Sequence, residues 1–283
     1  MIHLACAAEG AYVPHSAAML HSVLAHAGDV HVHYLHGPRF GEAAKLRELA
    51  GDITFHAVAD DAVAGFPSQH RFTRAMWYRL FLPELLPDVD RVLYLDADTL
   101  ALAPLGELWE TDLTGHWVAA VTNVFEPWSL ERPAQLGLAG PEAYFNSGVL
   151  LLNLAEMRRD GRGEALRALV RARGDELLWP DQDALNLVLG ERRLALHPRW
   201  NCMNSVLTFK AAVETFGAAA VEEARRRPGI RHFEGPDANK PWHLLCDVPG
   251  REAYFEHRRA TPWPRVRREG VTPLNLLRRA VRA

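Results

Sequence analysis

The sequence predicts an α/β fold with a mostly parallel central sheet and helices on both faces. Short apolar runs of strand length recur along the chain, and amphipathic segments with helical spacing separate several of them. The chain has 283 residues, of which 48% are hydrophobic and 24% charged, as in an ordinary globular protein. We therefore expect one large domain, in which ligands bind beyond the carboxyl ends of the strands.

The expected elements follow from these patterns in chain order. Strands are expected at 2–8, 30–36, 53–59, 91–97, 117–123, 147–154, 192–198 and 230–235. Helices are expected at 16–27, 41–50, 73–86 and 155–173, from Asp181 onward, and in the C-terminal PLNLLRRAVRA.

Charge and cysteine content exclude several classes of protein. The net charge of −3 argues against a general nucleic-acid binder. Cys6, Cys202 and Cys246 lie far apart and cannot all pair, which indicates reduced thiols in a cytoplasmic protein. The start MIHLACAAEGAY does not resemble a signal peptide, and no apolar run reaches the roughly 18 residues of a spanning helix.

The C-terminal segment differs in composition from the rest. We expect a domain at 1–248 and an Arg/Pro-rich extension at 249–283. After residue 250 the sequence has nine arginines and only three glutamates. Its last helix could attach to an anionic membrane, at the inner face of the cytoplasmic membrane, or could pack its leucines on the body. The sequence leaves both interpretations open.

The stretch LYLDADTL places two carboxylates directly after a buried strand. Asp96 and Asp98 are one residue apart, so in an extended chain they point to the same side. Two carboxylates held in this way repel each other, and a divalent metal ion is one way to relieve the repulsion. A solvated turn is the other interpretation.

Two later segments carry further polar residues. In IRHFEGPDANKPWH, His232 ends a strand, Gly235 allows a close backbone approach, and Lys240 could place a positive charge on a phosphate. An imidazole beside two carboxylates suits Mn²⁺ or Mg²⁺. In WPDQDALNLVLG, Asp181 and Asp183 either stabilise a helix N-terminus or, with Gln182, bind sugar hydroxyls.

Taken together, LYLDADTL, YFNSGVLLLNL, DQDALN and the H-x-x-G…KPW segment resemble glycosyltransferase family 8. The resemblance runs from the first strand to about Trp242. It implies a GT-A-type, Rossmann-like single domain and a metal-dependent, retaining transfer of a hexose. The implied donor is UDP-glucose or UDP-galactose, and the implied acceptor is a hydroxyl group of a glycan, a lipid-linked sugar or a small molecule.

The resemblance also implies roles for individual residues. Asp96, Asp98 and His232 would bind Mn²⁺ or Mg²⁺. Residues expected to contact the UDP-sugar are Ala7, Ala8, Glu9, Tyr12, Arg79, Asp96, Ala97, Asp98, Asn146, Gly235 and Lys240. Gln182 would lie beneath the anomeric carbon, with Asp181 and Asp183 orienting the sugar. Same-face attack is the favoured route to retention, and Asp183 is the alternative nucleophile.

The sequence departs from the family pattern in three places. The loop AAEGAY offers Glu9 where the family often has aspartates for uracil and ribose, and Tyr12 could stack on the base. Lys240 is five residues after Gly235, two more than in the close bacterial pattern. Asn123 replaces an acceptor-binding aspartate, which weakens any inference about the acceptor.

Two other functions fit part of the sequence. LYLDADTL also resembles the haloacid-dehalogenase motif, in which Asp96 would attack a phosphate and Asp98 would be the general acid/base. That motif is expected near the N-terminus, whereas here about 90 residues precede it. A catalytically silent sugar-nucleotide binder is the third possibility. Trp200, Asn201 and Asn204 could line an acceptor cleft.

Overall fold

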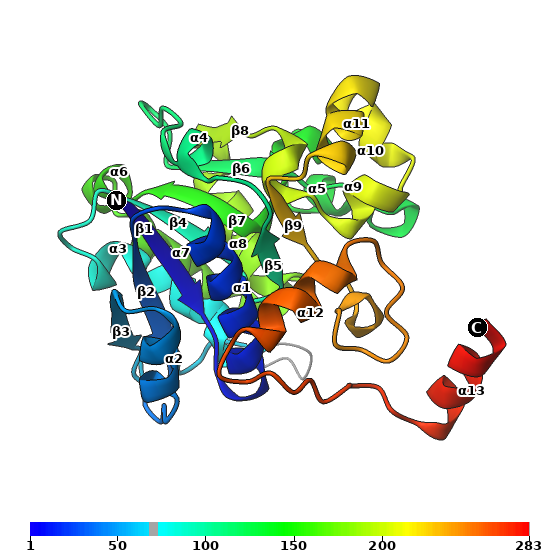
Figure 1. Ribbon diagram of the computed structural model, residues 1–283. Helices are drawn as coiled ribbons and strands as arrows, with labels where there is room; N and C mark the ends of the chain where they lie inside the picture. Colours follow the sequence, from blue (N-terminus) through cyan, green and yellow to red (C-terminus); the bar gives the residue numbers. More distant parts are fainter. Residues whose placement is uncertain (68–72, 283) are drawn as a thin grey trace.

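The computed structural model describes residues 1–67 and 73–282 and confirms the expected α/β architecture. A seven-stranded sheet has the order β3-β2-β1-β4-β7-β6-β8, and β5 and β9 form a small second sheet (Figure 1). The strands are β1 (Ile2–Ala7), β2 (Val30–His36), β3 (Ile53–Ala57), β4 (Arg91–Leu95), β5 (Thr99–Ala101), β6 (Val118–Thr122), β7 (Phe145–Asn153), β8 (Arg193–Ala195) and β9 (Ile230–His232).

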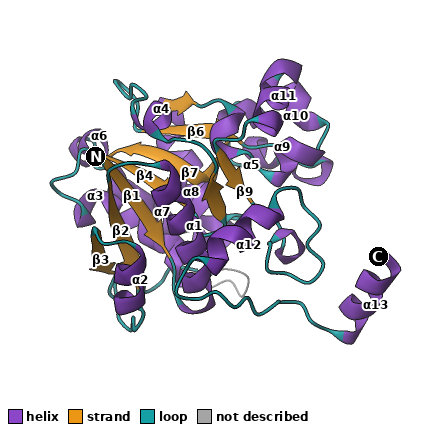
Figure 2. Cartoon of the chain, in the orientation of Figure 1, coloured by secondary structure: helices purple, strands orange, loops and turns teal. Residues whose placement is uncertain are grey.

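Helices lie around this sheet, except for α13, which lies apart from it (Figure 2). The α-helices are α1 (Val13–His26), α2 (Ala43–Leu49), α3 (Leu82–Leu85), α4 (Gly106–Trp109), α5 (Arg132–Gln135), α6 (Leu154–Arg159), α7 (Arg162–Arg173), α8 (Pro180–Leu189), α9 (Asn204–Thr208), α10 (Ala211–Phe216), α11 (Ala218–Arg226), α12 (Arg251–Arg259) and α13 (Pro273–Arg282). The 3-10 helices are η1 (Gly10–Tyr12), η2 (Arg74–Phe81), η3 (Pro127–Ser129), η4 (Pro141–Ala143), η5 (Gly174–Glu176), η6 (Gly190–Arg192), η7 (Pro198–Asn201) and η8 (Asp237–Asn239).

Strand β7 is the exception to an otherwise parallel main sheet. It pairs antiparallel with β4 and β6, with Leu95 opposite Val149. Strand β4 ends at Leu95, so the first residues of β7 extend past that end. The reversal therefore places 145–148 beside the chain that follows β4, where LYLDADTL carries its two carboxylates.

Each face of the sheet buries its own apolar cluster. Successive strand side chains point to opposite faces, so Leu4 and Leu93 pack in one cluster while Ala5 and Tyr94 pack in the other. The first cluster includes residues of α1, α9 and α11, and the second includes residues of η2, α7 and α8. Because both faces are covered, the strands read as nearly continuous apolar runs.

Two expected helices differ from the prediction. The helix predicted at 73–86 is η2 followed by the short α3, because Pro83 lacks the N–H that would bond back to Arg79 in a continuous α-helix. The helix predicted at 155–173 is divided into α6 and α7 at Gly161, whose φ of +63° lies in the left-handed region that glycine tolerates.

The C-terminal segment has a packed part and an exposed part. Helix α12 lies against α1, where the buried Tyr254 hydroxyl is 2.6 Å from His15 Nδ1. Helix α13 projects away from the sheet (Figure 1) and exposes Leu274, Leu277 and Val281. Within the described residues, the helices are too short or too polar to cross a bilayer.

Candidate active site

The small antiparallel sheet brings the two carboxylates to His232. Strands β5 and β9 pair with Thr99 opposite His232, and the Phe233 N–H donates to Asp98 O at 3.0 Å. One oxygen or nitrogen of each of Asp96, Asp98 and His232 lies within 4.8 Å of the others. Two carboxylate oxygens and one imidazole nitrogen suit Mn²⁺ or Mg²⁺, so the residues present fit a divalent ion.

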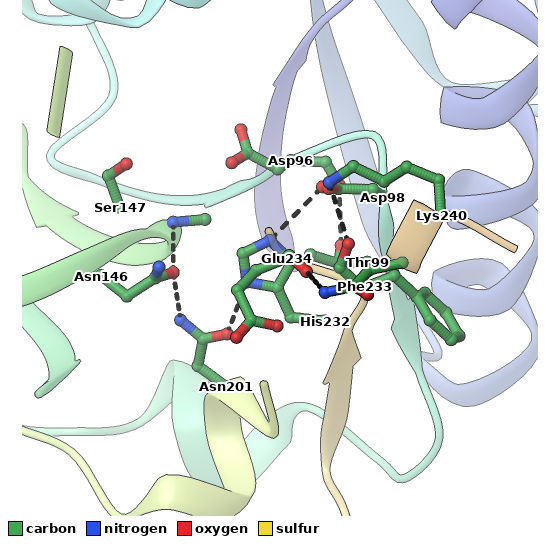
Figure 3. A network of polar contacts seen from close by, with 12 residues as sticks. Asp96, Asp98, Thr99, Asn146, Ser147, Asn201, His232, Phe233, Glu234 and Lys240 are labelled. Carbon is green, nitrogen blue, oxygen red and sulfur yellow. Dashed lines mark hydrogen bonds and ion pairs between the residues drawn. The ribbon is translucent and has the colours of Figure 1, made fainter. Parts of the chain in front are cut away.

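The buried Arg79 and the half-buried Lys240 compensate the carboxylates. Lys240 forms an ion pair with Asp98 and also donates to Phe233 O at 2.9 Å (Figure 3). Burial alone would raise the pKa of Asp98, but Lys240 and His232 hold it well below its usual range. Arg79 donates to Asp96 Oδ1 at 2.6 Å and lies 3.5 Å from Asp181 Oδ2. The longer loop before Lys240 therefore still delivers its ammonium group to the site.

Three consecutive residues at the start of β7 connect the parts of the site. Asn146 Oδ1 accepts from the Gly148 N–H at 3.0 Å, the Ser147 N–H donates to Gln182 Oε1 at 2.9 Å, and Gly148 O accepts from the Asp96 N–H at 2.9 Å. Gly148 also makes room for His232, because a Cβ there would lie 2.8 Å from both ring nitrogens. The NSG sequence thus fixes Gln182 relative to the three possible metal ligands.

Helix α8 supplies the remaining predicted catalytic residues, and they divide into two groups. Asp181 faces Arg79, and burial raises its pKa against the opposing effect of Arg79. Gln182 is partly exposed; its Nε2 donates to the Tyr144 hydroxyl at 3.2 Å.

Asp183, by contrast, is fully buried beneath the helix N-terminus. It accepts from Arg132 at 2.5 Å, from the Tyr144 hydroxyl at 2.6 Å and from the Leu178 N–H at 2.9 Å. A carboxylate with all these partners cannot reach a sugar without leaving them. These contacts hold Asp183 in place, and both roles expected for it, as a donor-orienting residue and as an alternative nucleophile, stay predictions.

The loop after β1 holds the residues expected to contact the nucleotide. Ala7 ends β1, the buried Ala8 donates its N–H to Leu35 O at 3.3 Å, and Glu9 accepts from the Tyr78 hydroxyl at 3.1 Å. Tyr12 packs edge-on against Trp242, with ring centroids 5.9 Å apart, and burial raises the pKa of Tyr12 to about 12.

The two remaining small residues are backbone positions. Ala97, which separates Asp96 and Asp98 in the sequence, has a buried side chain. Gly235 has a φ of +95°, in the left-handed region, and starts the loop that leads to Lys240.

Asn146 and Asn201 lie deeper than the sequence suggested. Asn201 is fully buried, so it does not line an acceptor cleft, and its Oδ1 is 2.9 Å from His232 Nδ1 (Figure 3). Asn201 Nδ2 donates to Asn146 Oδ1 at 2.8 Å. The contacts of Asn146 connect it through Asn201 to His232, and its expected contact with the UDP-sugar stays a prediction.

Sequence reasoning missed several residues that support the site. These are Arg132, Tyr144, Ser147 and Gly148, and the supporting position of Asn201. The YFNSG sequence was visible as a motif, but the partners of its polar atoms are set by β7 running antiparallel.

Comparisons with known proteins agree with this geometry. The family model described as Glycosyl transferase family 8 matches residues 3–246. General stress protein A of Bacillus subtilis (strain 168) is 30% identical over 230 residues, covering 80% of this chain and 76% of that protein. Lipopolysaccharide 1,2-glucosyltransferase of Escherichia coli (strain K12) is 30% identical over 230 residues, covering 79% of this chain and 66% of that protein.

A solved structure extends the similarity to three dimensions. The galactosyltransferase LgtC, crystallised with donor and acceptor sugar analogs, superposes with a TM-score of 0.78 at 29% identity. The match covers 92% of this chain and 96% of LgtC. The family match over most of the chain, the shared GT-A fold and the assembled polar site lead to one conclusion: the chain belongs to glycosyl transferase family 8 and is a glycosyltransferase.

Proposed function

We propose that this glycosyltransferase moves glucose or galactose from a UDP-sugar to a hydroxyl acceptor, with a divalent metal ion and with retention of configuration. The observation that carries the proposal is the cluster of Asp96, Asp98 and His232, whose ligand atoms lie within 4.8 Å of one another. The names of the relatives support a hexose: one is a lipopolysaccharide glucosyltransferase and another is a galactosyltransferase.

Asp96, Asp98 and His232 would hold Mn²⁺ or Mg²⁺. When bound, the ion supplies positive charge to the diphosphate as UDP leaves. Lys240 is the chain's own cation at this position, and it would exchange its contact with Asp98 for one with a phosphate oxygen. Arg79 stays paired with Asp96 and Asp181, so it orients both carboxylates.

Gln182 is the best-placed neutral polar group for the reacting sugar. Its carbonyl oxygen is held by the Ser147 N–H and its amide by the Tyr144 hydroxyl, which restricts the side chain to one orientation. Because Asp183 is enclosed by Arg132 and Tyr144, the acceptor hydroxyl and the leaving group would share one face of the sugar. Gln182 would then stabilise the positive charge that develops on the sugar ring.

The test is calorimetric titration of UDP with Mn²⁺ and after chelation, followed by a panel of UDP-sugars. We expect binding that needs the metal and slow hydrolysis of one UDP-hexose. Asp98→Asn should abolish both, whereas Asp112→Asn, at an exposed aspartate bonded to Thr114, should leave both unchanged. Metal-independent turnover, or unchanged turnover in Asp98→Asn, would refute the proposal.

The rival phosphatase function predicts a different result in the same experiment. It needs Asp96 free to attack phosphate, but Asp96 lies after the fourth strand and is paired with Arg79. Hydrolysis of a generic phosphate ester that is lost in Asp96→Asn would favour the phosphatase. A silent binder would bind UDP with metal and turn over none of the UDP-sugars.

We also propose that α13 attaches the enzyme to an anionic membrane surface from the cytoplasmic side. Leu274, Leu277 and Val281 are exposed at helical spacing, and Arg278 and Arg279 lie between them in the sequence. Each arginine near an anionic surface contributes about 1 kcal/mol. Co-sedimentation with phosphatidylglycerol vesicles should be lost in Leu277→Asp, and equal sedimentation of both proteins would contradict the proposal.

A further inference from the structure

We propose that Asn201 is a positioning residue that holds His232 in the tautomer with hydrogen on Nδ1, leaving the Nε2 lone pair free for a metal ion. The proposal rests on the proposed role of His232 as a metal ligand. It concerns a residue that does not itself touch metal or substrate. Asn201 acts through a chain of hydrogen bonds that starts at the backbone of β7 (Figure 3).

The direction of each hydrogen bond follows from a fixed donor. The Gly148 backbone N–H can only donate, so the atom of Asn146 that lies 3.0 Å from it must be the carbonyl oxygen Oδ1. The same oxygen is 2.8 Å from Asn201, and an oxygen there requires the amide nitrogen Nδ2 of Asn201 as donor. The orientation of the Asn201 side-chain amide is therefore determined.

With its nitrogen turned to Asn146, Asn201 turns its oxygen to His232. Asn201 Oδ1 lies 2.9 Å from His232 Nδ1, and an amide oxygen cannot donate. Nδ1 must therefore carry the hydrogen, and in a neutral imidazole Nε2 is then unprotonated. Nε2 is 3.4 Å from Asp98 Oδ1, so the free lone pair is on the side of the carboxylates.

Burial of these hydrogen-bonded residues supports the assignment of the His232 tautomer. Asn201 is fully buried and His232 is 3% exposed, so water cannot readily replace a missing partner. The backbone also fixes their separation: the Cys202 N–H donates to Ile230 O at 2.8 Å, and the His232 N–H donates to Cys202 O at 3.0 Å. Cys202, the residue after Asn201, is thus hydrogen-bonded to the two β9 residues that flank Arg231.

A hydrogen bond to the second ring nitrogen of a metal-binding histidine increases the affinity for the metal. Removing such a partner typically lowers metal affinity about 10- to 100-fold. Asn201→Leu removes the acceptor, so we expect Mn²⁺ binding in the absence of nucleotide to weaken by about that factor. Asn201→Asp keeps an oxygen toward Nδ1 while losing the donor to Asn146, so it should restore most of the affinity.

The experiment combines Mn²⁺ titration with ¹⁵N NMR of the histidine rings in metal-free protein. His232→Ala assigns the His232 signals, which should show hydrogen on Nδ1 in the natural sequence and a mixture of tautomers in Asn201→Leu. The matched control is Asn153→Leu, which replaces the half-buried last residue of β7 and the N-cap of α6, and it should leave both measurements unchanged. Thermal melting checks that each variant is folded.

The outcomes separate this inference from the proposed function. If His232→Ala weakens Mn²⁺ binding but folded Asn201→Leu does not, the positioning role is refuted and the metal site stands. Hydrogen on Nε2 in the natural sequence also refutes it. If His232→Ala binds Mn²⁺ as tightly as the natural sequence, the metal role of His232 fails, and the inference fails with it.

Discussion

Gly148 is the position where a single methyl group should disable the site. In Gly148→Ala the new Cβ would lie 2.8 Å from both ring nitrogens of His232 and closer still to Cε1. Ordinary contacts between non-bonded carbons are about 3.5–4.0 Å, so the ring must retreat by about 1 Å or more. The neighbour is a buried ring whose Nδ1 is hydrogen-bonded to Asn201, not a flexible side-chain end.

The retreat should affect both binding and stability. A displacement of about 1 Å takes the His232–Asn201 pair, now at 2.9 Å, out of hydrogen-bonding range. Losing even that supporting contact should weaken Mn²⁺ binding about tenfold or more. Overpacking in a buried site costs about 1–3 kcal/mol, which for a protein of this size lowers the melting temperature by several degrees.

The assay is calorimetric Mn²⁺ titration together with a thermal melt. Gly190→Ala is the matched control, because the nearest atom to its Cβ is Ala143 O at 3.9 Å and its backbone φ of −59° suits alanine. We expect the control to match the natural sequence in both measurements. Natural Mn²⁺ affinity in folded Gly148→Ala would refute the close packing of His232 against β7.

Three further perturbations test other parts of the structure. Lys240→Met removes the ammonium group from Asp98, so calorimetry should show unchanged or tighter Mn²⁺ binding but weaker UDP binding. Weaker binding of both ligands would contradict the proposal that Lys240 exchanges Asp98 for a phosphate oxygen. Arg132→Leu leaves the fully buried Asp183 without its cation and should lower the free energy of unfolding in urea by about 3 kcal/mol. Arg159→Leu removes an exposed arginine from a surface ion pair and should leave that free energy nearly unchanged. Burial and neighbouring histidines lower the pKa of His33 from 6.5 to about 3, so the folded state binds fewer protons than the unfolded state in this range. The free energy of unfolding should therefore fall as the pH drops from 6.5 toward 3. In His33→Gln the fall should be smaller, and an identical pH profile of unfolding would contradict this.

The strands and the cluster of Asp96, Asp98 and His232 were the predictable part of the structure. The run VLYL and the carboxylates after it gave β4 and a polar site beyond its end, because charge is costly inside a buried strand. His232 at the end of an expected strand was also placed correctly in the fold. These features depend on short windows of sequence, in which burial and strand periodicity leave a direct pattern.

The unpredicted part depends on contacts between distant segments. Strand β5 has only three residues, too few for a periodic pattern, yet its pairing with β9 is what brings Asp98 to His232. The partners of Asn201 and Asp183 likewise come from β7 and α5, far away in sequence. Asparagine and aspartate bind ligands as readily as they support neighbours, so residue type alone does not separate the two roles.

The charges of the assembled site would make the proposed binding of metal and nucleotide interdependent. Asp96, Asp98 and Asp181 carry three negative charges, and Arg79 and Lys240 carry two positive charges. With His232 counted as the neutral ligand of the proposal above, the site has a net charge of −1. A divalent ion alone would leave this buried site positive, and a diphosphate alone would leave it strongly negative. Together they return it near its starting charge, so each should favour the other.

We therefore expect positive coupling between Mn²⁺ and UDP. Coupling between two ligands is reciprocal, so the factor by which Mn²⁺ tightens UDP must equal the factor by which UDP tightens Mn²⁺. Four titrations measure both factors, each ligand with and without the other. Asp181→Asn removes one of the three negative charges without removing a proposed metal ligand, and it should weaken Mn²⁺ binding while tightening UDP binding in the absence of metal. Independent binding of the two ligands would contradict the charge argument, because two ligands of opposite charge that share a buried site cannot be indifferent to each other.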